Sequence, residues 1–432
     1  MIKISACYFP EMLILLFLVL SFPSFGNELK ELPVNYMGRF RPLEVYYHLN
    51  NTDPALKYVP DPALKVLPTT HEWLPLNQLK KERNPTLFSN QEWKNLKEAY
   101  SAWEKGDGKL FAETYFKAYK KLSLFPSRGQ LKVEILFYKW PLTSYAIWGY
   151  LISMVFFFLA YGISSHFLKI SAWISIGIAF TMHTLLLAAR IYILMRPPVS
   201  SMAETVIYVP WITIILGIYL SQKLRALFPV ILASGIAVSL LSILQWTFTP
   251  YHFENVQAVL NSQLWLITHV LMIVASYGVL IFGGTLGHML LIRPNEKLEE
   301  ALITSLYIGI ALLIPGTILG GVWAAQSWGR FWDWDPKESW AFISACVYLL
   351  VIHAYRFKKI GAKGLAIGSI FGLLAISFTW YGVNYILGTG LHSYGFGSGG
   401  EWIYFSYVGL ELLFMFLFSF KNSGFLKYKF DK

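Results

Sequence analysis

Nine apolar stretches dominate the sequence after residue 140, and each is long enough to cross a lipid bilayer. They cover residues 144–168, 170–192, 202–220, 226–245, 263–292, 301–323, 340–357, 365–387 and 402–420. Inside a bilayer the backbone polar groups of a single segment can be satisfied only by a helix. The sequence therefore predicts an all-α polytopic membrane protein with about nine transmembrane helices.

Composition excludes several classes of protein. Of the 432 residues, 55% are hydrophobic and only 14% are charged, which is too apolar for a soluble globular protein of this length. The net charge of +11 would suggest nucleic acid in a soluble protein, but here Lys and Arg lie in short loops between apolar runs, so no nucleic-acid partner is expected. The only cysteines are Cys7 and Cys346, so neither thiol-redox nor cysteine–zinc chemistry is expected.

The chain before the first span divides into two parts. Residues 1–26 resemble a signal sequence, with Lys3, an apolar run at 13–20 and small residues around Gly26, although an uncleaved anchor remains an alternative. Residues 27–139 are polar and predict a small extracytoplasmic domain, followed by a membrane domain at 140–420 and a cytoplasmic tail at 421–432.

Within the extracytoplasmic domain, the Pro-rich segment 27–85 predicts irregular structure. Apolar side chains then recur at helical spacing between residues 89 and 119. They are Trp93, Leu96, Tyr100 and Trp103, followed by Leu110, Tyr115 and Tyr119. This spacing predicts two amphipathic helices.

Basic residues orient the spans. The densest basic loop contains Arg356, Lys358, Lys359 and Lys363, and by the positive-inside rule it is cytoplasmic. Three segments then lie at the outer face: 246–262, 323–339 and 388–401. The polar N-terminal domain falls on the same side, as a signal sequence requires.

The segment 323–340 carries the strongest local signal. Asp335, Pro336 and Glu338 form the pattern of a helix N-terminal capping box, which requires no function. The aromatic residues of the segment are Trp323, Trp328, Trp332, Trp334 and Trp340. With Gly329 and Arg330 they predict an apolar platform beside a cation, which suits a planar ligand with acidic substituents such as haem b. An interfacial anchor loop is the alternative.

Three histidines fit that interpretation. His269 is near the outer end of its span and His392 is in a Gly-rich outer loop, so both are level with the tryptophans and could be axial ligands of haem iron. His353 is near the cytoplasmic end of its span, roughly 20 Å below the platform at about 1.5 Å per residue. It predicts an inner haem ligand, or else an interfacial histidine.

A further outer cluster contains Arg190, Arg196 and Glu204. These residues could bind propionates, or they could support the loop before the third span. The sequence favours neither interpretation.

The chain resembles the WWD family of haem-handling proteins in cytochrome c biogenesis, the group of CcsA, CcmC and CcmF. The segment 328–340 matches the WWD signature, and the sequences around His269, His353 and His392 are most similar to CcsA of the system II pathway. The segment 190–211 resembles the family's Arg, Pro and Glu-Thr segment. The resemblance covers about residues 172–420.

The resemblance implies roles for particular residues. His269 and His392 match the two external axial ligands, His353 matches a ligand of the inner haem, and Trp328, Gly329, Trp332, Trp334 and Asp335 match the haem-binding motif. The implied enzyme is a holocytochrome c synthase in the bacterial inner membrane, with its haem-attachment face toward the periplasm.

The implied partners are a CcsB-like membrane subunit, haem and apocytochrome c, with a thiol-reducing protein as a further candidate. Residues 132–140 resemble the junction in fused CcsB–CcsA synthases, so the chain is expected to be the C-terminal half of a split fusion. The other inner haem ligand of the family comes from CcsB.

Two alternatives of other classes stay open. One is a haem exporter or chaperone of the CcmC type, which does not form thioethers. The other is a membrane b-type cytochrome, which normally pairs histidines on facing helices. The Gly-rich loop around His392 suits a ligand that must be exchanged, which favours the synthase.

Overall fold

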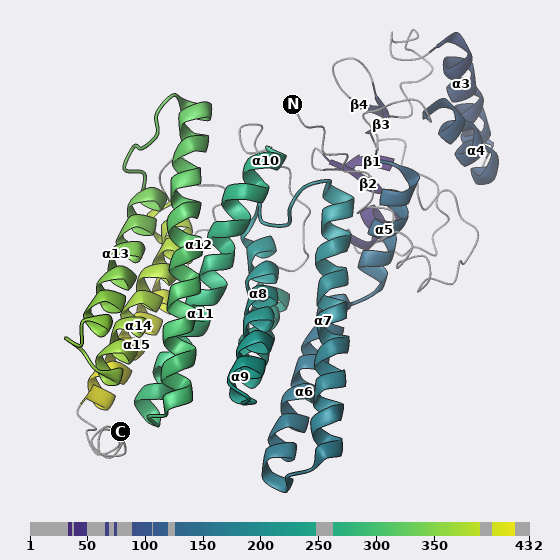
Figure 1. Cartoon of the computed structure of the whole chain (residues 1–432). Coiled ribbons are helices and arrows are strands. Elements are labelled where there is room, and N and C mark those ends of the chain that lie inside the picture. Colours follow the sequence, from purple (N-terminus) through teal and green to yellow (C-terminus); the bar gives the residue numbers. More distant parts are fainter. Residues whose placement is uncertain are drawn as a thin grey trace, which may run out of the picture. The chain divides into compact units, whose positions relative to one another are not determined.

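The computed structural model in Figure 1 describes residues 33–36, 39–49, 65–68, 73–75, 89–105, 107–119, 126–247, 262–388 and 400–419. Within these residues, nine helices are long and apolar enough to cross a membrane. The prediction of an all-helical, nine-span membrane part is confirmed.

The membrane part is built from α-helices and two π-helical segments, η4 and η5. Their bounds are α6 (Leu142–Ile163), α7 (His166–Leu194), α8 (Met202–Lys223), α9 (Phe228–Thr247), α10 (Gln263–Trp265), η4 (Leu266–Val270), α11 (Leu271–Ile292), α12 (Glu296–Trp328), α13 (Pro336–Arg356), α14 (Ala362–Ser377), η5 (Phe378–Leu387) and α15 (Glu401–Ser419). The elements α10, η4 and α11 form one span, and α14 and η5 form another.

Two boundaries differ from the sequence prediction because of local turn chemistry. The first break lies at Ser164 and Ser165 rather than at residue 169, and Ser164 has a φ of 52°. Helix α12 is longer than the apolar run that predicted it, since Asn295 caps its start by accepting hydrogen bonds from the backbone of Lys297 and Leu298. Hydropathy alone predicts neither a helix N-cap nor a residue with left-handed backbone conformation.

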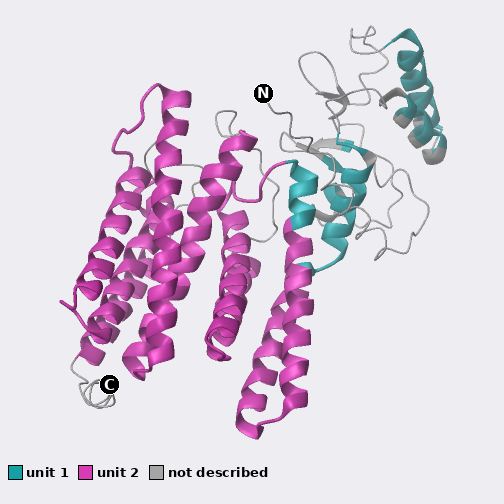
Figure 2. Ribbon diagram, in the orientation of Figure 1, with its two compact units in different colours: residues 1–142, 188–195, 252–255 teal, residues 143–187, 196–251, 256–432 magenta. Residues whose placement is uncertain are grey.

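The chain divides into two compact units (Figure 2). The larger comprises Thr143–Leu187, Arg196–Tyr251 and Val256–Lys432. Within it, α11 packs against α8, α12 and α14. Small residues permit this close approach, since a Cβ at Gly284 of α11 would lie 2.6 Å from the Cβ of Leu373. The core of this unit is therefore centred on α11.

The smaller unit comprises Met1–Leu142, Ala188–Met195 and His252–Asn255. Its described elements are β1 (Pro33–Tyr36), β2 (Arg39–Pro42), α2 (Leu43–Leu49), β3 (Lys65–Pro68), β4 (Trp73–Pro75), α3 (Asn90–Glu104), α4 (Gly108–Tyr119) and α5 (Arg128–Lys139). The strands form an antiparallel sheet in the order β2-β1-β3-β4. Four short strands thus lie in the segment expected to be irregular.

The two amphipathic helices predicted between residues 89 and 119 are confirmed as α3 and α4. Trp93, Leu96 and Tyr100 are buried on α3 as the spacing predicts. On α4 Tyr115 is buried as the spacing predicts, whereas Leu110 is exposed and its neighbour Phe111 is buried. The prediction for Leu110 was wrong because the larger Phe111 takes the inward position.

Candidate functional site

A cavity of about 190 Å³ lies in the larger unit, at the end of the bundle where α12 ends and α13 begins. Its wall is formed by the start of α8, by η4 and α11, by the last turns of α12, by the start of α13 and by η5. The lining residues that could act on a ligand are His269, Trp323, Trp332, Lys337, Trp380 and Asn384. Three of these, His269, Trp323 and Trp332, were candidates from the sequence.

His269 reaches the cavity from the π-helical segment η4. A π turn inserts one residue into the helical ladder and is common at functional sites. The His269 Nδ1 lies 2.7 Å from the carbonyl oxygen of Gly316. A carbonyl only accepts, so Nδ1 carries the proton and the lone pair is on Nε2, the form in which imidazole binds a metal.

The surroundings of His269 fix the orientation of its ring. The imidazole meets the Trp323 ring edge to face, at 5.9 Å between centroids and 65°. Trp323 in turn stacks on Trp265 at 6.5 Å and 12°. On the other side, a Cβ at Gly320 would lie 2.6 Å from the His269 Cε1, so only glycine leaves room for the ring. Gly320 was not a candidate from the sequence, although a Gly-Gly pair inside an apolar span is a signal of close packing.

The connection between α12 and α13 follows the helix chemistry that the sequence predicts. Gly329 ends α12 with a φ of 75°. Asp335 caps α13 by accepting a hydrogen bond from the Lys337 backbone at 2.9 Å, and Pro336 is the first helical residue. The Glu338 Oε2 accepts from the backbone of Asp335 at 3.3 Å and of Asp333 at 2.9 Å. The capping box is therefore confirmed, and Glu338 also holds the loop before it.

The five tryptophans predicted as a platform are divided among different environments. Trp323 and Trp332 line the cavity, whereas Trp328, Trp334 and Trp340 do not. The ring of Trp334 is 69% exposed and perpendicular to that of Trp332, at 88°. Trp340 instead packs on Phe378, at 4.2 Å between ring centroids. These rings do not form one flat surface.

Arg330 has a carboxylate partner. Its guanidinium lies 2.6 Å from the Asp333 carboxylate, and both side chains are substantially exposed. Exposed ion pairs of this kind contribute little to stability and exchange partners readily. Arg330 does not line the cavity.

Lys337 is a cavity residue that sequence reasoning missed. Its Nζ donates to the carbonyl oxygens of Thr379 at 2.6 Å and Trp380 at 3.1 Å, both at the start of η5. A π-helix shifts the carbonyl ladder by one residue, which allows side chains to take up its carbonyl oxygens. The sequence feature that could have indicated Lys337 as a site residue is its position in the first turn of a helix that begins inside a tryptophan-rich segment.

The segment η5 supplies two further cavity residues that lay outside the predicted segment. Trp380 lines the cavity, and its Nε1 donates to the Thr205 hydroxyl of α8 at 3.0 Å. The Asn384 Oδ1 is buried without a hydrogen-bond partner among the described residues. A buried polar atom of this kind at a cavity is suited to a ligand or a water molecule.

The cluster of Arg190, Arg196 and Glu204 does not line the cavity. Arg190 belongs to the smaller unit, is fully buried and lies 5.9 Å over the Phe137 ring. The Glu204 carboxylate accepts from the backbone and the hydroxyl of Ser200, at 2.8 and 2.6 Å. Since Ser200 lines the cavity, this geometry fits support of the loop before α8.

Comparison with known proteins decides the family. The model of the cytochrome c assembly protein family matches residues 199–392, a range that contains every residue lining the cavity. The CcsA protein of Prochlorococcus marinus is 31% identical over 242 residues, which cover 46% of this chain and 75% of that protein. The chain belongs to the CcsA family of cytochrome c biogenesis proteins.

Other relatives in this family extend the match. The CcsA protein of Chlamydomonas reinhardtii is 31% identical over 216 residues, 46% of this chain and 61% of that protein. Protein NrfI of Wolinella succinogenes is 31% identical over 360 residues, which cover 76% of this chain. The matched region is 39% of NrfI, so the chain spans about two fifths of that relative's length.

The other histidine candidates of this CcsA-family chain occupy different places. His353 is exposed on α13, with Nδ1 2.7 Å from the Leu349 carbonyl oxygen and its ring 6.3 Å from the Phe357 ring. His392 lies outside the described residues.

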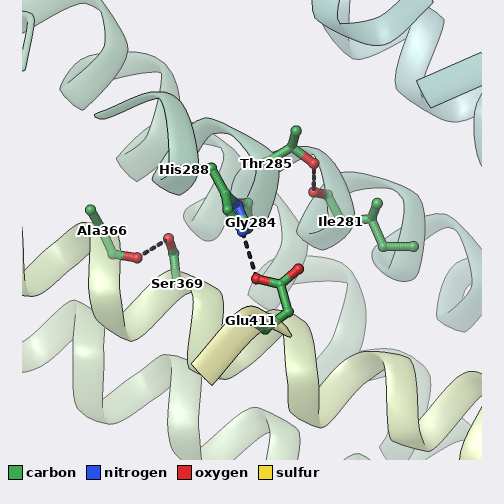
Figure 3. Close-up of polar contacts among 7 residues, drawn as sticks. All are labelled: Ile281, Gly284, Thr285, His288, Ala366, Ser369 and Glu411. Atoms are coloured by element: carbon green, nitrogen blue, oxygen red, sulfur yellow. Dashed lines mark hydrogen bonds and ion pairs between the residues drawn. The ribbon is translucent and has the colours of Figure 1, made fainter. Parts of the chain in front are cut away.

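Two histidines without a predicted role have structural ones. His183 is fully buried, with Nδ1 3.1 Å from the Tyr150 hydroxyl and Nε2 2.9 Å from the Ile207 carbonyl oxygen. His288 of α11 forms a 2.6 Å ion pair with Glu411 of α15 (Figure 3). These two residues are 123 positions apart, and nothing in the sequence pairs them.

Proposed function

We propose that this chain binds haem b at the cavity and, with a CcsB-like membrane subunit, transports haem across the membrane and attaches it to apocytochrome c. Haem is the substrate here. The observation that carries the proposal is His269, which lines a cavity walled by Trp323, Trp332 and Trp380 and whose Nδ1 lies 2.7 Å from the Gly316 carbonyl oxygen. Aromatic walls suit a planar macrocycle, and neutral imidazole suits its iron.

The second external ligand in this proposal is His392. In the chain it lies between η5 and α15, eight residues after the cavity residue Asn384 of η5. A ligand from a connecting segment can be displaced more easily than one on a helix. The histidine of the incoming CxxCH motif could then replace it.

The attachment chemistry needs no leaving group. Each cysteine S–H adds across one haem vinyl C=C bond, so that a C–S bond forms at one carbon and hydrogen is added to the other. The addition consumes no electrons, but both thiols must start reduced, which is the role proposed for a thiol-reducing partner. The contribution of this chain would be positioning, which alone can supply large rate effects.

The proposed route begins at His353. Its exposed position on α13, with Nδ1 engaged by Leu349, supports an inner haem site completed by a residue of the partner subunit. The basic loop after α13, which includes Lys358 and Lys359, supports a cytoplasmic location for that end. The cavity would then face the periplasm of a bacterial inner membrane.

The proposal is tested in a bacterial host that lacks its own cytochrome c maturation system. The chain is expressed with and without a CcsB-like partner, together with an apocytochrome c reporter and a reporter whose CxxCH cysteines are changed to alanine. The expected result is haem that stays on the first reporter after denaturing electrophoresis, only when both subunits are present. Haem bound to the complex but never attached to the reporter would favour an exporter or a b-type cytochrome.

A further inference from the structure

The ammonium group of Lys337 is a charged feature of the cavity that an aromatic site for a neutral ring does not explain. Its two partners, the carbonyl oxygens of Thr379 and Trp380, accept hydrogen bonds but carry no negative charge. Lys337 forms no ion pair with any described residue. A cation removed from water is costly unless an anion accompanies it, so an anionic group bound in the cavity would stabilise this ammonium.

The two carboxylates beside Lys337 already hold other groups. Asp335 acts on Lys337 electrostatically, but its carboxylate accepts the Lys337 backbone N–H rather than the ammonium. Glu338, which also lines the cavity, accepts the backbone N–H groups of Asp333 and Asp335. Both carboxylates therefore accept backbone N–H groups around the start of α13, and neither forms an ion pair with the Lys337 ammonium.

Other features of the cavity also favour an anion. The N-termini of α8 and α13 both border it, through Ser201 and Met202 on one side and Lys337 on the other. Helix N-termini carry partial positive charge and favour negative groups. An anion at Lys337 would thus be stabilised by the ammonium and by two helix dipoles.

We infer that Lys337 binds a carboxylate of the ligand, which on haem is a propionate; this rests on the proposed function. The cavity, at about 190 Å³, is smaller than the roughly 300–1,000 Å³ of pockets that enclose a whole small ligand. Only one edge of a haem macrocycle would enter it. With the propionate edge at Lys337, the opposite edge, which carries the vinyl groups, stays outside and accessible to thiols.

The test compares two porphyrins on the purified full chain: iron protoporphyrin IX and its dimethyl ester, which lacks both negative charges. Binding is followed by the Soret absorbance in the same detergent. We expect the unaltered chain to prefer the diacid at least about ten-fold, since one charge-assisted hydrogen bond contributes about that factor. Lys337→Met should lose this preference through weaker binding of the diacid, with affinity for the ester unchanged.

Two further variants separate contact from packing. Lys337→Arg keeps the charge and should keep a preference for the diacid. Lys297→Met, in the first turn of α12, removes a lysine that is not in the cavity and should leave the affinities for both porphyrins unchanged. The inference is overturned if Lys337→Met weakens both porphyrins equally, because Lys337 would then only brace η5. Failure of the unaltered chain to bind either porphyrin would instead overturn the proposed function itself.

Discussion

His269 and His288 lie on the same membrane span, 19 residues apart, but their ring nitrogens have different partners. The Nδ1 of His269 lies 2.7 Å from the Gly316 carbonyl oxygen, and its side chain lines the aromatic cavity. At His288 Nδ1 lies 2.8 Å from the Gly284 carbonyl oxygen and Nε2 lies 2.6 Å from the Glu411 carboxylate (Figure 3). His269 therefore lines the cavity as a candidate ligand, whereas His288 lies outside the cavity lining and is held in an ion pair with Glu411.

The largest expected effect follows from removing the candidate ligand. His269→Gly should lower the haem content of the purified protein by about ten-fold or more and abolish attachment to the reporter, because the iron loses a ligand held by a second-sphere hydrogen bond. Added imidazole should restore part of both. His288→Gln is the matched control and should retain its haem, as read from the Soret band. Equal haem loss in both variants would remove the distinction between the two histidines.

A smaller effect is expected on stability at the other histidine. His288→Leu or Glu411→Leu should each lower the free energy of unfolding by about 1–3 kcal/mol, since each leaves the other partner uncompensated. The value is below that of a fully buried pair because the side chains are 21% and 13% exposed. The double variant should recover most of the loss. Denaturant unfolding in detergent measures the free energy of unfolding of the two single variants and the double variant. If the double variant lost the sum of the two single losses, His288 and Glu411 would not be interacting directly.

The smallest effect is expected at the contact that orients His269. Gly320→Ala should weaken haem binding several-fold, because the added Cβ would lie 2.6 Å from the imidazole Cε1 and force the ring to shift. Gly409→Ala, where an added Cβ meets no atom within 4 Å, is the matched control. Soret titration of both variants gives the comparison. Unchanged affinity in Gly320→Ala would mean that the ring orientation does not matter for binding.

The spans and the helix cap could be predicted from sequence because each depends on neighbouring residues. Apolar runs of bilayer length predicted the nine helices, and Asp335 with Glu338 predicted the capping box. The π-helical segments η4 and η5 could not be predicted this way. A π turn inserts one residue without interrupting the apolar pattern, so hydropathy does not register it.

The wall of the cavity was only partly predictable for a different reason. Clustering in one segment singled out Trp323 and Trp332, but Trp380 is 40 or more residues away in sequence and reaches the cavity through the packing of η5. Lys337 was visible in the motif, yet its direction depends on carbonyl groups of that same distant segment. Long-range packing therefore determined which residues of the motif face the cavity.

The most direct test of the central claim is a structure of the complex with haem trapped by an apocytochrome c peptide whose CxxCH cysteines are changed to serine. The account predicts iron within bonding distance of the His269 Nε2, with one edge of the macrocycle between Trp323, Trp332 and Trp380. Haem bound elsewhere, with His269 turned from the iron, would contradict it.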